Sequence, residues 1–244
     1  MIILPSVIGA GASSKARLSG GGGDYTADGV SYSNVRLLLH GEGLSGGSTF
    51  TDNSSYANTI TRGGTPTTSS TQFKYGSTSI AFNGSTDYLI LPNNAVLSPG
   101  SGNWIFESWV YMTAAGRYSW LNLHPTSPSF SNSTLQLYLD NSNGFYLDDS
   151  NTGGASGTAG FSLNDWHYIV ISRSGTSSVQ GWIDGVRRLN TTSAANYGTT
   201  LAQARIGIDK DGSSFFPGYL DEVRLTTGQS KDGSAVPNGT FPNS

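Results

Sequence analysis

The sequence has no cysteine, little charge and no long apolar run. Without cysteine no disulfide framework can form, which excludes the small disulfide-stapled folds. Charged residues make up 12% of the 244 residues, and glutamate occurs at only three positions, Glu42, Glu107 and Glu222. Helical bundles and coiled coils need a composition rich in Ala, Glu, Lys and Leu, so these classes are excluded as well. No apolar stretch approaches the length of about 18 residues that a membrane-spanning helix needs.

The charge of the chain also limits its partners. The formal net charge is −3 and there is no run of basic residues, which argues against nucleic-acid binding through a basic surface. The N-terminus is apolar, but it lacks the positively charged start of a secretory signal and is interrupted by Pro5. We therefore expect synthesis in a cytoplasm without export by the usual signal.

The residues that are abundant point to β-structure. Glycine occupies 33 positions, and aromatic residues make up 11% of the chain. Gly, Ser and Thr disfavour helix interiors, whereas Tyr, Trp, Phe, Val, Ile and Thr favour strands. Low charge together with this aromatic content argues against disorder. The chain is therefore predicted to be all-β and turn-rich, and it is long enough for one large sandwich.

Three regions are expected along the chain. Residues 1–34 combine an apolar start with four consecutive glycines at 20–23, which cannot hold regular structure without outside support. We interpret this region as an extended arm that a partner orders, because leaving its apolar side chains exposed would be costly; a floppy tail is the alternative. Residues 35–228 form the predicted domain, and residues 229–244 form a polar C-terminal tail.

Short apolar segments separated by turn residues run through the predicted domain, as expected for a sandwich. Leu135, Leu137 and Leu139 alternate with polar residues, so we expect them on a buried face and Tyr138 on the opposite face. Asp184-Gly185 signals a two-residue hairpin, because a type I′ turn needs positive φ at both central positions. The other strands are expected at 35–40, 79–82, 88–91, 104–111, 145–147, 166–171, 179–183, 205–208 and 219–225.

Four segments carry a recognisable pattern in the same order along the chain. They are GSTSIAFNGSTDYL at 76–89, WIFESWV at 104–110, WHYIV at 166–170 followed by WIDG at 182–185, and GYLDEVR at 218–224. This pattern resembles the laminin-G-like, concanavalin A-like lectin/glucanase jelly rolls, over about residues 35–228. The resemblance implies a jelly-roll sandwich of two antiparallel sheets.

The start of the predicted domain carries a more particular pattern. It reads LLLHGEG at 37–43 and then FTDNSS at 50–55. These segments resemble the version of the domain that is common in structural proteins of tailed phages, including tail fibres and head appendages. The resemblance implies a virion protein, which agrees with the expected lack of a secretory signal.

No single strand of the sequence offers an arrangement for catalysis; the alternative is a carboxylate pair assembled from distant strands. Glycosidases of this fold use a strand of the form E-x-D-x-x-E, since a retaining mechanism needs two carboxyl groups about 5–5.5 Å apart. Here Glu107 is followed by Ser and Trp, and the adjacent Asp221 and Glu222 are expected on opposite faces of a strand. There is no cysteine nucleophile and no G-x-S-x-G motif. We therefore interpret the chain as a non-catalytic member of the fold.

Calcium is the one cofactor that the resemblance implies. Related jelly rolls hold a structural calcium ion between the early loop and the final strand, and the matching positions here are Asp52 and Asp221, with His40 beside them. Carboxylates and carbonyl groups are the hard oxygen ligands that calcium needs. The alternatives are that Asp52 caps a turn and that Asp221 pairs with an arginine.

Four residues on or beside the middle strands are candidates for contact with a glycan. They are Tyr138, Trp120, Tyr146 and His124. Aromatic rings and neutral polar groups suit uncharged sugars. Tyr138 is the best single candidate, because its neighbours Leu137 and Leu139 are expected on the buried face. The alternative is that these aromatic residues belong to the core or to ordinary surface.

Together these observations predict a non-enzymatic structural protein of a virion surface, a capsid decoration or tail component made in the host cytoplasm. The arm is expected to attach it to a capsid or tail protein, and the jelly roll to face outward, where it adheres to host polysaccharide. A homo-oligomer is expected, with a trimer favoured because virion decorations and fibres are commonly trimeric. The alternatives are a carbohydrate-binding module of a non-viral surface protein and a glucanase-like glycoside hydrolase.

Overall fold

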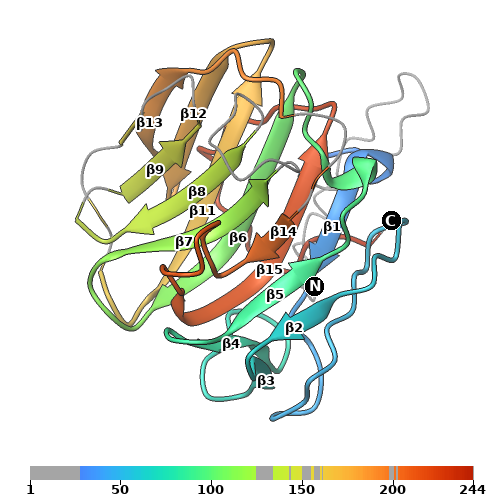
Figure 1. Ribbon diagram of the computed structural model, residues 1–244, viewed down its shortest axis with the longest axis vertical. Helices are drawn as coiled ribbons and strands as arrows, with labels where there is room; N and C mark the ends of the chain where they lie inside the picture. Colours follow the sequence, from blue (N-terminus) through green and yellow to red (C-terminus); the bar gives the residue numbers. More distant parts are fainter. Residues whose placement is uncertain are drawn as a thin grey trace, which may run out of the picture.

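The computed structural model describes residues 28–124, 134–142, 144–149, 155–156, 160, 162–197, 201 and 203–243. These residues form two antiparallel sheets packed face to face, as Figure 1 shows. This is the jelly-roll sandwich that the sequence predicts. Most of the predicted arm, residues 1–27, lies outside the described residues.

Each sheet mixes strands from distant parts of the chain. The eight-stranded sheet has the order β13-β12-β11-β6-β15-β4-β3, with β1 paired to β15, and the seven-stranded sheet has the order β10-β9-β8-β7-β14-β5-β2. The first sheet contains β1 (Val35–Leu39), β3 (Thr67–Ser69), β4 (Ser79–Asn83), β6 (Trp104–Met112), β11 (Trp166–Ser174), β12 (Ser178–Ile183), β13 (Val186–Thr192) and β15 (Pro217–Thr227). The second contains β2 (Thr61–Gly63), β5 (Tyr88–Leu91), β7 (Arg117–His124), β8 (Leu135–Asp140), β9 (Gly144–Asp148), β10 (Ala155–Ser156) and β14 (Gln203–Ile206).

Most predicted strands are present, and their local signals explain why. The hairpin between β12 and β13 turns at Asp184 and Gly185, whose φ angles are 51° and 79°, as a type I′ turn requires. The sequence analysis gave no residue range for β2, β3, β7, β10 or β13. Strand β7 begins with polar residues and contains a bulge, so its alternation is broken. Two short 3₁₀ helices, η1 (Tyr32–Asn34) and η2 (Ala95–Leu97), are the helical elements of the described chain.

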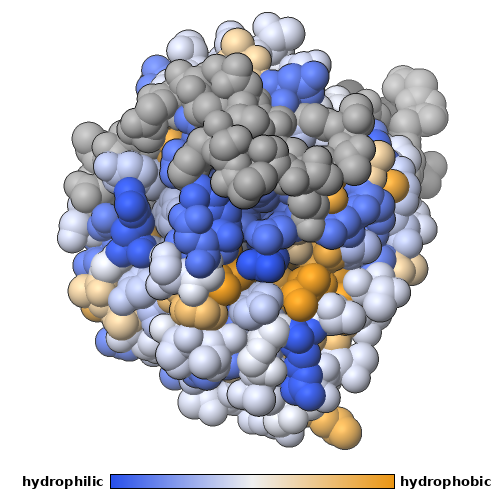
Figure 2. Space-filling model, viewed as in Figure 1, coloured by the Kyte–Doolittle hydropathy of each residue, from blue (hydrophilic) through white to orange (hydrophobic). Residues whose placement is uncertain are grey.

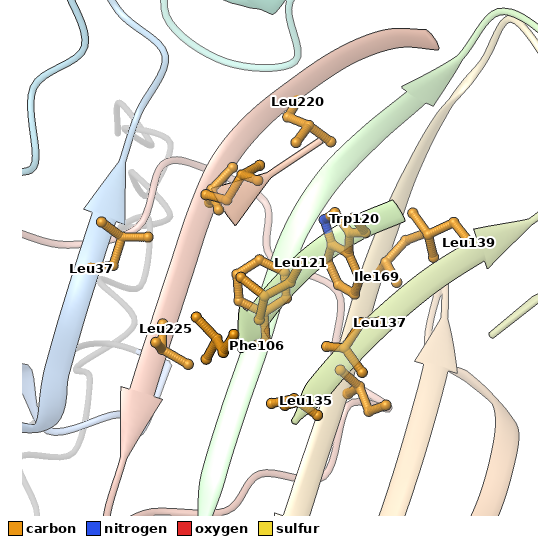
Figure 3. Close-up of a cluster of buried hydrophobic side chains, with 14 of the residues drawn as sticks. Leu37, Phe106, Trp120, Leu121, Leu135, Leu137, Leu139, Ile169, Leu220 and Leu225 are labelled. Atoms are coloured by element: carbon orange, nitrogen blue, oxygen red, sulfur yellow. The ribbon is translucent and has the colours of Figure 1, made fainter. Parts of the chain in front are cut away.

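The main core lies between the two sheets. Figure 3 shows Phe106 and Ile169 of the eight-stranded sheet facing Trp120, Leu121 and the leucines of β8. Trp120 and Phe106 pack with ring centroids 4.5 Å apart. Burying side chains of this size stabilises the fold by roughly 1.5–3 kcal/mol each. Removing one of them therefore costs a large fraction of a typical domain's total stability.

The two ends of the described chain cover the outer face of the eight-stranded sheet. Val30, near the start, and Phe241, near the end, are both buried there with Trp109, Tyr168 and other side chains of a second apolar cluster. Residues 28–34 of the predicted arm and the 229–243 segment therefore contact the jelly roll.

A group of charges holds these ends in place. Glu107 on β6 is fully buried and accepts hydrogen bonds from Arg224 on β15, with Nε to Oε1 at 2.9 Å. Lys231 Nζ lies 2.8 Å from Glu107 Oε2, and Arg224 also contacts Asp28. The Tyr168 hydroxyl donates to Glu107 as well. We call these five residues the terminal charge network, because Asp28 and Lys231 belong to the two chain ends that it joins.

No helix of the described ranges has the length and hydrophobicity needed to cross a membrane.

Candidate functional site

The candidate site lies on the outer face of the seven-stranded sheet, where the sequence places Tyr138. Leu137 and Leu139 point into the main core, so Tyr138 between them points outward, as predicted. Its hydroxyl donates to Gln136 Oε1 at 2.9 Å. Burial, followed by the negative charge of Asp209, raises the pKa of Tyr138, so the phenol stays neutral and serves as a donor.

A second tyrosine and an arginine join Tyr138 on this face. Tyr146 on β9 lies directly opposite Tyr138 in the strand register. The guanidinium carbon of Arg117 lies 4.5 Å from the ring centroid of Tyr146 and 5.1 Å from that of Tyr138. Such cation–π contacts hold the rings and the exposed arginine in fixed positions. We call these three residues the tyrosine–arginine patch.

Beside this patch runs a row of amide side chains that the sequence interpretation missed. Asn122 on β7 lies opposite Gln136 on β8, and Gln203 on the neighbouring β14 lies opposite His124. Within the described residues, neither amide atom of Asn122 has a hydrogen-bond partner, and the same holds for Gln136 Nε2 and Gln203 Oε1. We call Asn122, Gln136 and Gln203 the amide row. The sequence did contain a signal for this row, because a polar residue stands between two leucines on each of β7 and β8.

The unpartnered atoms of the amide row are unusual for their burial. Asn122 and Gln136 are fully buried, and a buried polar group without a partner costs about 1–3 kcal/mol. Ser119 and Thr134 each add a further buried hydroxyl without a partner. Amides, hydroxyls and phenols are the groups that bind water or sugar hydroxyls through directed hydrogen bonds. Figure 2 shows hydrophilic residues gathered across the middle of this face.

The other two predicted glycan contacts have different positions. His124 is buried at the end of β7, next to the amide row. Trp120 is wrong as a contact residue, because it is fully buried in the main core and its Nε1 donates to Ser108 Oγ at 3.0 Å. The reason is a bulge between Ser119 and Leu121, which turns Trp120 inward together with Leu121.

The three predicted calcium ligands are not brought together as one set. The carboxylate of Asp52 accepts five hydrogen bonds, from the backbone N–H groups of Leu38, Ser54 and Asn58 and from the side chains of Ser54 and Asn58. A carboxylate has about four lone-pair sites, so Asp52 is saturated. It caps the loop after β1, which is the alternative that the sequence left open.

His40 is also fully engaged. Its Nδ1 lies 2.7 Å from Glu222 Oε1, and its Nε2 lies 2.5 Å from Asn243 Oδ1. Burial alone would lower the pKa of His40, but the hydrogen bond and the negative charge of Glu222 outweigh burial and raise it. The imidazole therefore ties β1 to the bulge of β15 and to the C-terminal segment, and neither nitrogen is open to a metal.

Asp221 is the one predicted ligand that keeps an open oxygen. Its Oδ2 accepts from the backbone N–H groups of Lys74 and Tyr75, whereas its Oδ1 is buried without a partner among the residues that the structure describes. Burial raises the pKa of Asp221 to about 7, although the two N–H groups act in the opposite direction. A cation at Oδ1 fits this oxygen. The described residues contain no group of three His, Cys, Asp or Glu side chains that could hold a metal, so backbone carbonyls would have to supply its other ligands.

Each glutamate of the chain has a structural partner. Glu42 accepts from the backbone and hydroxyl of Ser77, Glu107 binds Arg224, and Glu222 binds His40 and the backbone N–H of Phe241. These contacts use the carboxylates to fasten loops and chain ends. They do not place two glutamates together on one strand face, as the glycosidases of this fold require.

A two-sheet jelly roll with polar and aromatic side chains on the outer face of one sheet is the architecture of a lectin-like binding domain. The comparison with protein families agrees. The model of the concanavalin A-like lectin/glucanases superfamily matches residues 83–229, more than half of the chain, and the chain belongs to this superfamily. None of the curated proteins matches the sequence.

Solved structures of similar fold include an arabinanase domain and two toxin binding domains. Domain 4 of AbnA, a GH43 extracellular arabinanase from Geobacillus stearothermophilus, was solved in complex with arabinotriose; it matches with a TM-score of 0.61 and 15% identity over 82% of this chain and 96% of that chain. The binding domain of Paraclostridial Mosquitocidal Protein 1 matches with a TM-score of 0.60 and 13% identity, over 83% of this chain and 51% of that chain. The receptor-binding domain of botulinum neurotoxin C/D mosaic serotype matches with a TM-score of 0.59 and 16% identity, over 82% of this chain and 49% of that chain.

The matches cover different shares of the three solved structures. The chain spans about half the length of the two toxin domains, whereas it covers nearly all of the arabinanase domain. Identities of 13–16% establish a shared fold and nothing more specific. The fold is thus that of carbohydrate- and receptor-binding domains.

Proposed function

We propose that the outer face of the seven-stranded sheet binds a neutral glycan, and that the chain acts by binding and not by catalysis. The observation that carries this proposal is the tyrosine–arginine patch beside the amide row, whose buried amide atoms lack protein partners. Tyr146 and Arg117 offer a partly exposed ring and exposed donor groups to a sugar. The buried amides offer hydrogen bonds to an ordered water that bridges to a sugar hydroxyl. The arabinotriose complex of the similar arabinanase domain supports this choice of ligand class.

The charges around the patch favour neutral over acidic glycans. Arg117 lies opposite Asp140 in the strand register, and it acts on Asp148 together with Lys210. The positive charge of Arg117 is therefore already offset by nearby carboxylates. An acidic sugar would meet these carboxylates as well as the guanidinium group, so we expect little gain in affinity from a negative charge on the ligand.

The test is binding of the full chain to neutral polysaccharides such as arabinan and β-glucan, measured by affinity electrophoresis. Tyr146→Ala should weaken binding about tenfold, the equivalent of about 1.4 kcal/mol. The matched control is Tyr56→Ala, because Tyr56 is also an exposed tyrosine packed against an arginine, Arg36 at 5.0 Å, but lies elsewhere. Binding that Tyr146→Ala leaves unchanged would overturn the proposed site. Release of reducing sugar from these polymers would overturn the non-enzymatic role.

We further propose that the protein is displayed on a virion, as a capsid decoration or tail component, with the glycan-binding face outward. In support, residues 28–34 and 229–243 pack on the outer face of the eight-stranded sheet, opposite the candidate site. A partner bound through the preceding residues would thus leave the candidate face open. We expect the partner to be a capsid or tail protein and the displayed form to be a homotrimer.

Deleting residues 1–27 tests this second proposal. The deletion spares Asp28 and Val30, which contact the jelly roll, so the domain should keep its melting temperature. Purified particles should no longer incorporate the shortened chain. Incorporation at the level of the full chain would contradict the role of the arm, and a monomer in sedimentation of the full chain would contradict the trimer.

A further inference from the structure

A cavity of about 310 Å³ lies at the end of β1, away from the tyrosine–arginine patch. Two segments supply most of its lining, His40 to Glu42 and Phe50 to Asn53. These are the segments whose pattern stood out in the sequence, and the glycan-binding face makes no use of them. We call this cavity the β1 pocket.

The floor and the remaining lining of the β1 pocket differ in character. The floor consists of Leu39, Phe50 and Ile80, whose side chains are buried in the main core. The polar residues Glu42, Thr51 and Asn53 complete the lining. In the described part of the chain no hydrogen bond uses the Thr51 hydroxyl or the Asn53 side-chain amide, so both are available to a ligand.

The walls of the pocket are held rigid by contacts that do not involve its interior. Gly41 has a φ of 76°, and a Cβ there would lie 3.1 Å from the backbone of Ser79, so only glycine lets this wall approach β4. Ser77 fixes the Glu42 carboxylate, with its N–H 3.0 Å and its hydroxyl 2.8 Å away. The five hydrogen bonds to Asp52 fix the opposite wall. The pocket is therefore formed before any ligand binds, which lowers the cost of binding.

We infer that the β1 pocket binds a single neutral sugar residue, such as the end or a branch of a glycan. An apolar floor suits the C–H face of a sugar ring, while a carboxylate, an amide and a hydroxyl in the lining suit its hydroxyl groups. The volume is at the lower end of the range of about 300–1,000 Å³ for ligand pockets, which favours one residue over an extended chain. The imidazole of His40 is paired with Glu222, so the lining presents no free cation to an acidic sugar.

This inference takes only its ligand class from the proposed function, and the two sites can be tested separately. The probes are free D-glucose, D-galactose and L-arabinose, each added to the full chain and followed by saturation-transfer NMR. Thr51→Trp fills the mouth of the pocket. Thr59→Trp is the matched control, because Thr59 is the exposed bridge partner of Thr51 but does not line the pocket.

At least one sugar should give a signal with the parent chain and with Thr59→Trp, and the signal should disappear with Thr51→Trp. Asn53→Ala should weaken binding about tenfold, as expected for loss of a hydrogen bond to the ligand. An unchanged melting temperature shows that each variant is folded. No signal with any of the three sugars, or an equal signal with Thr51→Trp, would overturn the inference.

The outcome for the sheet face is independent of this result. Tyr146→Ala should leave the monosaccharide signal unchanged while it reduces polysaccharide binding. Loss of the monosaccharide signal with Tyr146→Ala, together with its retention in Thr51→Trp, would assign the sugar to the sheet face and overturn the β1 pocket.

Discussion

Replacing Glu107 by glutamine tests how the chain ends are fastened to the jelly roll. Glutamine has nearly the same shape as glutamate, so the change removes a charge and leaves the packing in place. Glu107 and Arg224 are both fully buried and joined through Oε1, and Lys231 and Tyr168 contact the other oxygen. After the change, Arg224 keeps only Asp28 as a charged partner in the terminal charge network.

The expected loss follows from the burial of the pair. Removing one partner of a buried ion pair costs about 3–5 kcal/mol, because the other charge is left without compensation in a medium of low polarity. Domains are typically stable by about 5–15 kcal/mol, so the effect is a large part of the total. With a urea dependence of about 2–3 kcal/mol per molar, the unfolding midpoint should fall by more than about 1 M.

Urea unfolding followed by tryptophan fluorescence measures this shift. Glu42→Gln is the matched control, because Glu42 is exposed and glutamine can keep both contacts with Ser77. Its amide oxygen accepts from the backbone N–H, and its NH2 group donates to the hydroxyl oxygen. The control should stay within about 1 kcal/mol of the parent. A loss of stability for Glu107→Gln no larger than that of the control would refute the reasoning. It would mean that burial of the charges costs as much as their attraction returns.

The terminal charge network also predicts a pH dependence: burial would raise the pKa of Glu107, but the charges of Arg224 and Lys231 outweigh burial and lower it. The stability that Glu107 contributes is therefore present above its ordinary pKa of about 4.3 and is lost as the pH falls through the lower folded value. Melting temperatures of the parent and Glu107→Gln should converge in acid, and a constant gap would contradict this. Trp120→Ala should lower the free energy of unfolding by about 3–5 kcal/mol, and a change below about 1 kcal/mol in urea would refute its place in the core. Calcium at Asp221 stays a prediction: calcium chloride should raise the melting temperature of the parent but not of Asp221→Asn, and equal melting with calcium and with chelator would refute it.

Much of the fold could be predicted from local sequence patterns. The alternation around Leu137 placed Tyr138 on the outer face, and Asp184-Gly185 gave the hairpin, because each signal depends only on near neighbours in the chain. Composition excluded the helical classes of protein, because the preference of each residue type for helix or strand does not depend on tertiary contacts. Strand β7 was missed because its bulge breaks the alternation at Trp120, so the sequence offered no register from which to place Trp120 in the core.

The functional residues were harder to predict than the strands. Tyr146 and Tyr138 were both named from sequence, but their pairing across β8 and β9 and their contact with Arg117 depend on strand register. Asn122 and Gln203 come from strands far apart in sequence that lie side by side only in the folded sheet. No local pattern reports that their amide atoms lack partners.

The sequence by itself determined that this chain is an all-β jelly roll with few carboxylates, because composition and residue alternation act locally along each strand. Only the tertiary structure decided that Trp120 belongs to the core and not to the surface. It also decided that Asp52 caps a loop and does not act as a metal ligand. It also decided where the few charges lie: Glu107 binds two chain ends that are distant in sequence. The physical reason is that burial and hydrogen-bond partners are properties of the assembled sheets, and residues far apart in the chain supply them.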